Sequence, residues 1–256
     1  MCPPISRGFS HRLIAIAWEY DPGPPEHYEP RLGPLARNHI PHMVASGVTS
    51  WNQIAPDFER SFENIDTFLA VARTSRALGL MNTLWTDDGQ MLMRMTWPGI
   101  AYGAAAAWQN QSMDERNFFS EYSQLTTAAP AAPEVASALG DLAQAETAVQ
   151  KVLADDSMLS FWDNPFSPAM LKKCTENQEA LHQARMLAED AEEHLGRARA
   201  LGADAASLNS FVVAGAECWT TPGKSSRQVP SSLPCGSGWD RSAQPVNCGG
   251  TNGNRR

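Results

Sequence analysis

The sequence predicts an α/β fold, because short apolar runs in the first half of the chain alternate with helical patterns. Three runs have the length of strands and lie at residues 13–17, 42–48 and 79–84. Each is followed within a few residues by a tryptophan, namely Trp18, Trp51 and Trp85. The repeated order of strand and helix predicts parallel strands joined by right-handed crossovers, with the tryptophans on one rim of the sheet.

Two helices are expected between these strands. The first covers residues 31–39, and the second follows the middle strand. In the second, apolar residues recur every three or four positions, which is typical of one buried helix face. They are Phe62, Ile65, Phe68, Leu69 and Ala72.

The segment after the third run predicts a binding site. The apolar run stops at Trp85, and two carboxylates follow at Asp87 and Asp88. An aromatic ring and a nearby carboxylate suit a sugar, whose C–H face packs on the ring while its hydroxyls donate to the carboxylate. The alternative is a helix N-cap at Asp88, because Gly89 and Gln90 lead into another apolar stretch.

A set of ordered motifs extends through this half of the chain. They are Ile14-Ala15, Trp18-Glu19-Tyr20-Asp21-Pro22, Gly47-Val48-Thr49-Ser50-Trp51-Asn52, Pro56-Asp57-Phe58, Asn64-Ile65, Thr83-Leu84-Trp85-Thr86-Asp87, and the stretch from Trp97-Pro98-Gly99 to Trp108. With them the chain resembles family 20 glycoside hydrolases, the β-N-acetylhexosaminidases. The resemblance implies a partial (β/α)8 TIM barrel, comprising the last three βα units (strands six to eight) and the final barrel helix.

The resemblance also implies site residues. Trp18, Trp51 and Trp85 would enclose an N-acetylated sugar, and Asp87 stands where the family places an acidic residue that binds sugar hydroxyls. That residue is commonly glutamate in the family, so the shorter Asp87 changes its reach. The expected partner is therefore a glycan that contains N-acetyl-hexosamine.

No catalytic residue is expected in this chain. The family's general acid is a glutamate in a His-x-Gly-Gly-Asp-Glu motif on the fourth barrel strand, and the chain is expected to begin after that strand. Its Asp114-Glu115 dipeptide lacks this context, and Ser112 with Glu115 has the spacing of a helix capping box. We expect a C-terminal fragment that keeps the aromatic sugar-binding residues named above and is catalytically inactive alone. The alternative is a non-catalytic carbohydrate-binding or helical interaction module.

Composition divides the chain into four parts. Residues 1–11 are expected to be an irregular N-terminus, 12–111 the partial barrel, 112–216 a helical domain and 217–256 a disordered tail. The helical domain should contain helices at 134–153 and 204–214, and one long helix with a seam of regularly spaced apolar residues. The seam comprises Leu171, Cys174, Leu181, Ala184, Ala188, Ala191, Leu195 and Ala198. An appended helical bundle is expected, with a protein-binding coiled coil as the alternative.

Charge and residue spacing argue against several classes of function. The chain has 256 residues and a formal net charge of −8, which argues against nucleic acids and anionic membranes as partners. No apolar run has the length of a membrane span, and residues 13–17 are too short for a signal-peptide core. Its five cysteines and six histidines show no metal-binding or redox spacing, so no metal or cofactor is expected. The sequence does not indicate in which cellular compartment the protein functions.

Overall fold

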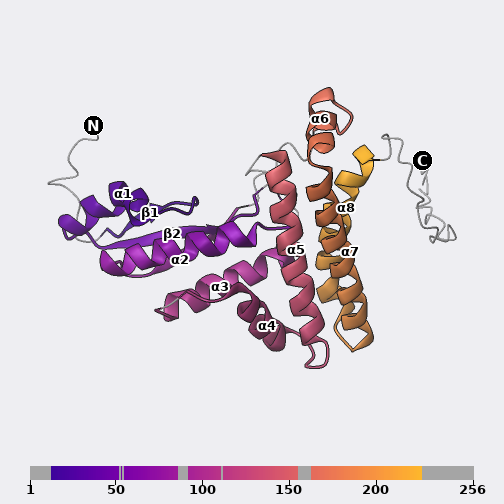
Figure 1. The fold of residues 1–256 in the computed structure, drawn as a ribbon. Coiled ribbons are helices and arrows are strands. Elements are labelled where there is room, and N and C mark those ends of the chain that lie inside the picture. Colours follow the sequence, from indigo (N-terminus) through magenta and orange to yellow (C-terminus); the bar gives the residue numbers. More distant parts are fainter. Residues whose placement is uncertain are drawn as a thin grey trace, which may run out of the picture.

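The computed structural model describes residues 13–51, 53, 55–85, 92–110, 112–154 and 163–226, with the backbone alone for 217–226. Within these residues the fold is α/β, as predicted (Figure 1). The first half contains strands β1 (Ala15–Trp18), β2 (His42–Val48) and β3 (Leu80–Leu84), helices α1 (Pro25–Arg37), α2 (Phe58–Thr74) and α3 (Trp97–Trp108), and the 3-10 turn η1 (Met93–Thr96). The second half contains α4 (Glu115–Thr126), α5 (Ala132–Leu153), α6 (Pro168–Glu176), α7 (Gln178–Ala200) and α8 (Ala205–Ser226).

The three strands form one parallel sheet in the order β1-β2-β3. Ala17 lies opposite Val44, and Val44 lies opposite Leu80. Since parallel neighbours need a crossover connection, each pair is joined through a helix. The predicted strand type and strand order are confirmed.

Helix α2 is the central element of the helical layer. Asp57 caps its first turn, because the carboxylate accepts a hydrogen bond of 2.9 Å from the backbone N–H of Arg60. The predicted apolar face is buried against β2. Helices α1 and α3 lie against α2 on either side, so the three helices cover the same face of the sheet.

Helix α3 approaches the sheet closely because it carries glycine where it meets the strands. A Cβ atom at Gly99 would lie 2.7 Å from the side chain of Val48, and one at Gly103 would lie 2.3 Å from Asn82. The amide of Asn82 donates to the carbonyl oxygen of Gly99 at 3.0 Å. These contacts fix α3 against the carboxyl end of β2 and the middle of β3.

Among the described residues, no helix covers the opposite face of the sheet. Ile16, Trp18 and Met81 project from it and are exposed, and Ala45 is buried between Trp18 and Met81, although parallel sheets in globular proteins are normally covered on both faces. In the described part of the chain, β1 and β3 are both edge strands. The described sheet therefore has an exposed apolar face, and the outer edges of β1 and β3 pair with no other described strand.

The second half is helical, but two local predictions for it are wrong. Helix α4 is capped by Asp114, which accepts from the N–H of Asn117 at 2.9 Å, and not by a capping box at Ser112. The expected long helix is interrupted at Asn177, which separates α6 from α7. The buried seam accordingly belongs to α7 and runs from Leu181 to Ala198.

Helices α5, α7 and α8 run alongside one another (Figure 1). Helix α5 matches the expected helix at 134–153 closely. Helix α8 extends beyond the expected end at 214, and its backbone stays helical to Ser226, ten residues into the expected tail at 217–256. Residues 1–12, which include the expected irregular N-terminus, and residues 227–256 lie outside the described part.

One hydrophobic core runs through both halves. The ring of Phe62 in α2 stacks on Tyr102 in α3 at 3.8 Å between centroids, and both rings contact Phe118 in α4. The same cluster continues to Leu139 in α5 and Leu195 in α7. The helices of the second half therefore pack on the sheet through the outer side of α2 and α3.

Candidate functional site

Three aromatic side chains gather where the strands end. Tyr20 follows β1, Trp51 follows β2 and Trp85 follows β3. The Tyr20 and Trp51 rings are 5.2 Å apart between centroids and inclined by 43°. The indole Nε1 of Trp85 donates a hydrogen bond of 2.8 Å to the Tyr20 hydroxyl. We call Tyr20, Trp51 and Trp85 the aromatic wall.

Gly47, the penultimate residue of β2, lies under the wall. A Cβ atom built there would be 2.9 Å from Cδ1 of Tyr20 and 3.2 Å from the Trp51 ring. Both distances are too short for a methyl group without a shift of the rings. The missing side chain of Gly47 therefore lets Tyr20 and Trp51 pack directly over the strand.

The structure brings together two of the four residues predicted for the site. Trp51 and Trp85 both contact Tyr20, and Trp85 is 44% exposed. Trp18 lies on the same open face at the end of β1 and is 64% exposed, but in the described residues it makes no ring contact with the wall. Asp87 lies outside the described residues.

Tyr20 is the member of the wall that the sequence reasoning did not select. It occupies the centre of the group, because both tryptophans contact it. A signal was present, since side chains alternate along an extended chain and residue 20 therefore shares a face with Trp18. In the motif Trp18-Glu19-Tyr20, only the tryptophan was predicted to belong to the site.

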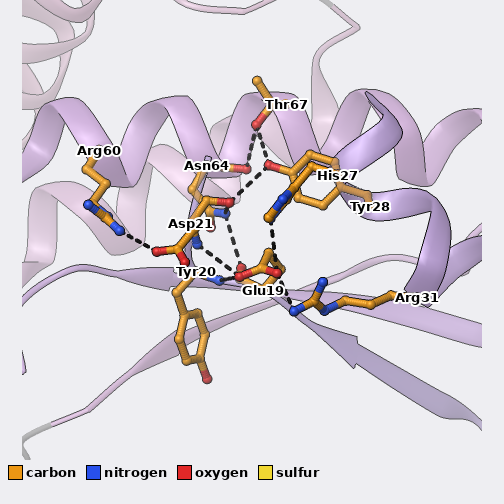
Figure 2. Close-up of polar contacts among 9 residues, drawn as sticks. All are labelled: Glu19, Tyr20, Asp21, His27, Tyr28, Arg31, Arg60, Asn64 and Thr67. Carbon is orange, nitrogen blue, oxygen red and sulfur yellow. Dashed lines mark hydrogen bonds and ion pairs between the residues drawn. The ribbon is translucent and has the colours of Figure 1, made fainter. Parts of the chain in front are cut away.

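A network of polar side chains lies on the other side of this segment. Figure 2 shows the Tyr20 ring directed away from α2, while Glu19 and its partners lie on the helix side. The Glu19 carboxylate is buried and accepts from the backbone N–H groups of Tyr20 and Asp21 at 3.0 and 3.2 Å. Its second oxygen lies 3.1 Å from Nε2 of His27 and 2.5 Å from the Arg31 guanidinium.

Side chains of α2 bind the segment of residues 19–21. Asn64 is fully buried, and its amide donates to the carbonyl oxygens of Glu19 at 3.1 Å and Asp21 at 3.3 Å. The Asp21 carboxylate pairs with the guanidinium of Arg60, one turn earlier on α2. The backbone around Tyr20 is therefore bound by side chains after regular strand pairing has ended (Figure 2).

Tyr28 extends this network into the helical layer. Its hydroxyl lies 2.7 Å from Oγ1 of Thr67, and its ring stacks on Phe68 at 4.6 Å between centroids. Burial raises the pKa of Tyr28, so its hydroxyl stays neutral and able to donate. Tyr28 thus belongs to the support of the site and not to its surface.

The aromatic wall offers ring faces, a phenolic hydroxyl and an indole edge, which is the chemistry of a binding surface. The carboxylates of the two residues that flank Tyr20 in the sequence, Glu19 and Asp21, pair with arginines on the helix side. Among the described residues, no three His, Cys, Asp or Glu side chains are placed to hold a metal ion. None of the described helices has the length and apolar character needed to cross a membrane.

Comparison with known proteins finds no relative of this chain. No family model, no curated protein and no solved structure matches it. The geometry of the aromatic wall and the motifs of the sequence are therefore the grounds on which a function is proposed.

Proposed function

We propose that the aromatic wall binds the N-acetyl-hexosamine of a glycan, and that the chain is the C-terminal part of a β-N-acetylhexosaminidase-like glycoside hydrolase. One observation carries the proposal: Tyr20, Trp51 and Trp85 gather at the carboxyl ends of three neighbouring parallel strands. Parallel α/β barrels keep their sites at that end of their strands.

The proposed architecture is a partial barrel followed by a helical bundle. Three consecutive parallel strands, with their helices on one face, have the arrangement of successive βα units. In a closed barrel, the open face with Ile16, Trp18 and Met81 would face the interior. This correspondence supports the assignment of the strands to the sixth, seventh and eighth positions of the barrel.

The wall has the chemistry that a sugar requires. Exposed ring surface on Trp85 can pack against the C–H face of a pyranose. The Tyr20 hydroxyl accepts from Trp85 and keeps its own proton to donate to a sugar oxygen. Asp87, two residues beyond Trp85, is proposed as the acceptor for sugar hydroxyls, and Trp18 as a further aromatic contact.

In the proposed parent enzyme, an acid protonates the glycosidic oxygen and the substrate's acetamido group is the nucleophile. In this chain, Asp114 and Glu115 begin α4, where Asp114 caps the helix. This placement supports a structural role for the dipeptide. We expect the chain alone not to hydrolyse an N-acetylglucosaminide, because loss of a general acid lowers the rate by roughly 10²–10⁴.

A non-catalytic carbohydrate-binding or helical interaction module is the second candidate. It is favoured by the engagement of Glu19 and Asp21, whose oxygens are turned toward the cations of α1 and α2. The enzyme fragment and a carbohydrate-binding module would both use the aromatic wall for sugar, and they differ in whether this surface completes an active site. A helical interaction module would not bind sugar there.

A titration of the full chain with N-acetylglucosamine, followed by tryptophan fluorescence, tests the proposal. Trp85→Ala should weaken binding by about tenfold, because it removes an aromatic contact. Trp108→Ala is the matched control, since Trp108 ends α3 and is 92% exposed. Equal loss in both variants, or no saturable binding by the wild-type chain, would contradict the proposal.

Enzymatic activity is tested separately with a chromogenic N-acetylglucosaminide. The expected result is no turnover above background. Turnover that Asp114→Ala or Glu115→Ala abolishes would assign catalysis to the dipeptide and overturn the proposed division of roles.

A further inference from the structure

We infer that Asn64 is a positioning residue for the aromatic wall, because one buried amide binds the backbone on both sides of Tyr20 and the backbone of Gly47. The consequence for sugar binding rests on the proposed function. The positioning itself is a property of the folded chain and can be tested without a sugar.

The first step concerns Tyr20. Pairing between β1 and β2 ends with the bond from the N–H of Glu19 to the carbonyl oxygen of Ala45, at 3.1 Å. Beyond it, the carbonyl oxygens of Glu19 and Asp21 accept from Nδ2 of Asn64. These two peptide groups flank Tyr20, so the amide fixes the direction in which its ring leaves the chain.

The second step concerns the strand beneath the ring. Oδ1 of Asn64 accepts from the N–H of Gly47 at 3.4 Å. Gly47 is the residue on which the Tyr20 and Trp51 rings rest. Asn64 therefore sets the distance between the ring of Tyr20 and its support, because the same side chain binds both.

The third step concerns the chemical identity of residue 64. An asparagine side chain has an acceptor at one end and two donors at the other, and here the acceptor faces an N–H while the donors face two carbonyl oxygens. Aspartate has nearly the same shape but would turn an oxygen toward the carbonyls of Glu19 and Asp21. Asn64→Asp therefore keeps the bond to Gly47 and releases the segment that carries Tyr20.

The Trp85 indole N–H reports on this positioning, because it donates to the Tyr20 hydroxyl. In the full chain, its hydrogen exchange measured by NMR should become about three- to tenfold faster in Asn64→Asp and Asn64→Ala, the change expected for loss of one hydrogen bond. Thr74→Val is the matched control. The Thr74 hydroxyl donates to carbonyl oxygens of the last turn of α2, Val71 at 2.8 Å and Ala70 at 3.2 Å, so its loss should leave the indole exchange unchanged.

Unchanged indole exchange in a folded Asn64 variant overturns the inference, and far-UV circular dichroism establishes whether the variant is folded. If neither variant folds, the wild-type chain supplies the test. Both Nδ2 protons of Asn64 should then be protected from exchange and show hydrogen-bond couplings to the carbonyl carbons of Glu19 and Asp21. Rapidly exchanging Nδ2 protons without such couplings also overturn it.

Titration with N-acetylglucosamine separates this inference from the proposed function. If both hold, Asn64→Asp binds the sugar about three- to tenfold more weakly than the wild-type chain and Thr74→Val binds it equally well. Faster indole exchange without sugar binding by the wild-type chain supports positioning and contradicts the proposed function. Sugar binding that Asn64→Asp leaves intact, with unchanged indole exchange, contradicts positioning alone.

Discussion

The hydrogen bond from the indole Nε1 of Trp85 to the hydroxyl of Tyr20 joins the end of β3 to the end of β1 across the central strand. The two residues are 65 positions apart in the chain and meet at a distance of 2.8 Å. The outer strands of the sheet thus share a contact above β2. The aromatic wall therefore forms only when all three strands are paired, because one of its residues follows each strand.

Tyr20→Phe tests this bridge. The ring keeps its contact with Trp51, but the acceptor for Trp85 is lost, and a neutral hydrogen bond contributes about 0.5–1.5 kcal/mol. We expect N-acetylglucosamine binding, measured by fluorescence titration, to weaken by about three- to tenfold. Tyr122→Phe removes a hydroxyl from α4 and serves as the control. An equal effect of the two substitutions would show that the hydrogen bond between Trp85 and Tyr20 does not contribute to binding.

Gly47→Ala tests the close packing of the wall on β2. The new methyl group must displace the Tyr20 ring, and overpacking of this kind costs about 1–3 kcal/mol of unfolding free energy. Gly140→Ala in α5 is the matched control, because no atom lies within 4 Å of the added Cβ. There the substitution should stabilise the chain by about 0.5–1 kcal/mol, since alanine favours a helix over glycine. Urea unfolding measures both, and a neutral Gly47→Ala would contradict the packing described.

Phe62→Ala tests whether the two halves share one core. The ring contacts both α3 and α4, so its removal should lower the unfolding free energy by about 3–5 kcal/mol. The loss should appear in one cooperative transition seen alike by tryptophan fluorescence and by far-UV circular dichroism. Leu125→Ala, at a side chain that is 87% exposed, should change stability by less than about 0.5 kcal/mol. Two separate transitions would mean that the halves unfold independently.

Glu115 should make stability depend on pH. Burial raises the pKa of its carboxyl, and the neighbouring carboxylates Glu59, Asp114 and Asp57 raise it further. In the window above the ordinary pKa, the folded state binds more protons than the unfolded state, so the contribution to stability falls as the pH rises. Glu115→Gln should therefore stabilise the chain near neutral pH, and the gain should vanish as the pH falls toward the ordinary pKa of glutamate.

Urea unfolding at several pH values measures this difference between wild type and variant. Glu121→Gln, on an exposed position of the same helix, is the control and should show no such trend. A Glu115→Gln variant less stable than the wild type near neutral pH would show that Glu115 stabilises the start of α4.

The parallel sheet was predictable because strand, helix and strand each left a periodic pattern in the sequence. The wall was predictable in part. Tryptophans after each strand indicated its place, whereas Tyr20 follows from the alternation of side chains beyond the end of β1. Asn64 also had a signal, because it lies among Phe62, Ile65 and Phe68 on the buried face of α2, where a polar side chain requires a partner.

Other features depend on tertiary contacts that local patterns do not contain. Ser112 and Asp114 are both good N-cap residues, and the packing of Phe118 and Phe119 in the core places the start of α4 after Asp114. The apolar spacing of the seam passes through Asn177 without a break, so that spacing alone does not show that α6 ends there, although asparagine is a common residue at helix ends. Helix ends in this chain are thus determined by neighbouring elements as well as by their own residues.

The continuous core has a consequence for anyone who wishes to transplant the wall to another scaffold. Truncation of the chain after α3 would remove the contacts of Phe118 with Phe62 and Tyr102. It would expose to solvent the side of α2 and α3 that faces away from the sheet. The portable unit is therefore not the sheet with its three helices. It extends into α8, because the aromatic wall depends on α2, and the core that supports α2 continues through α4, α5 and α7 to Leu208 and Phe211 of α8.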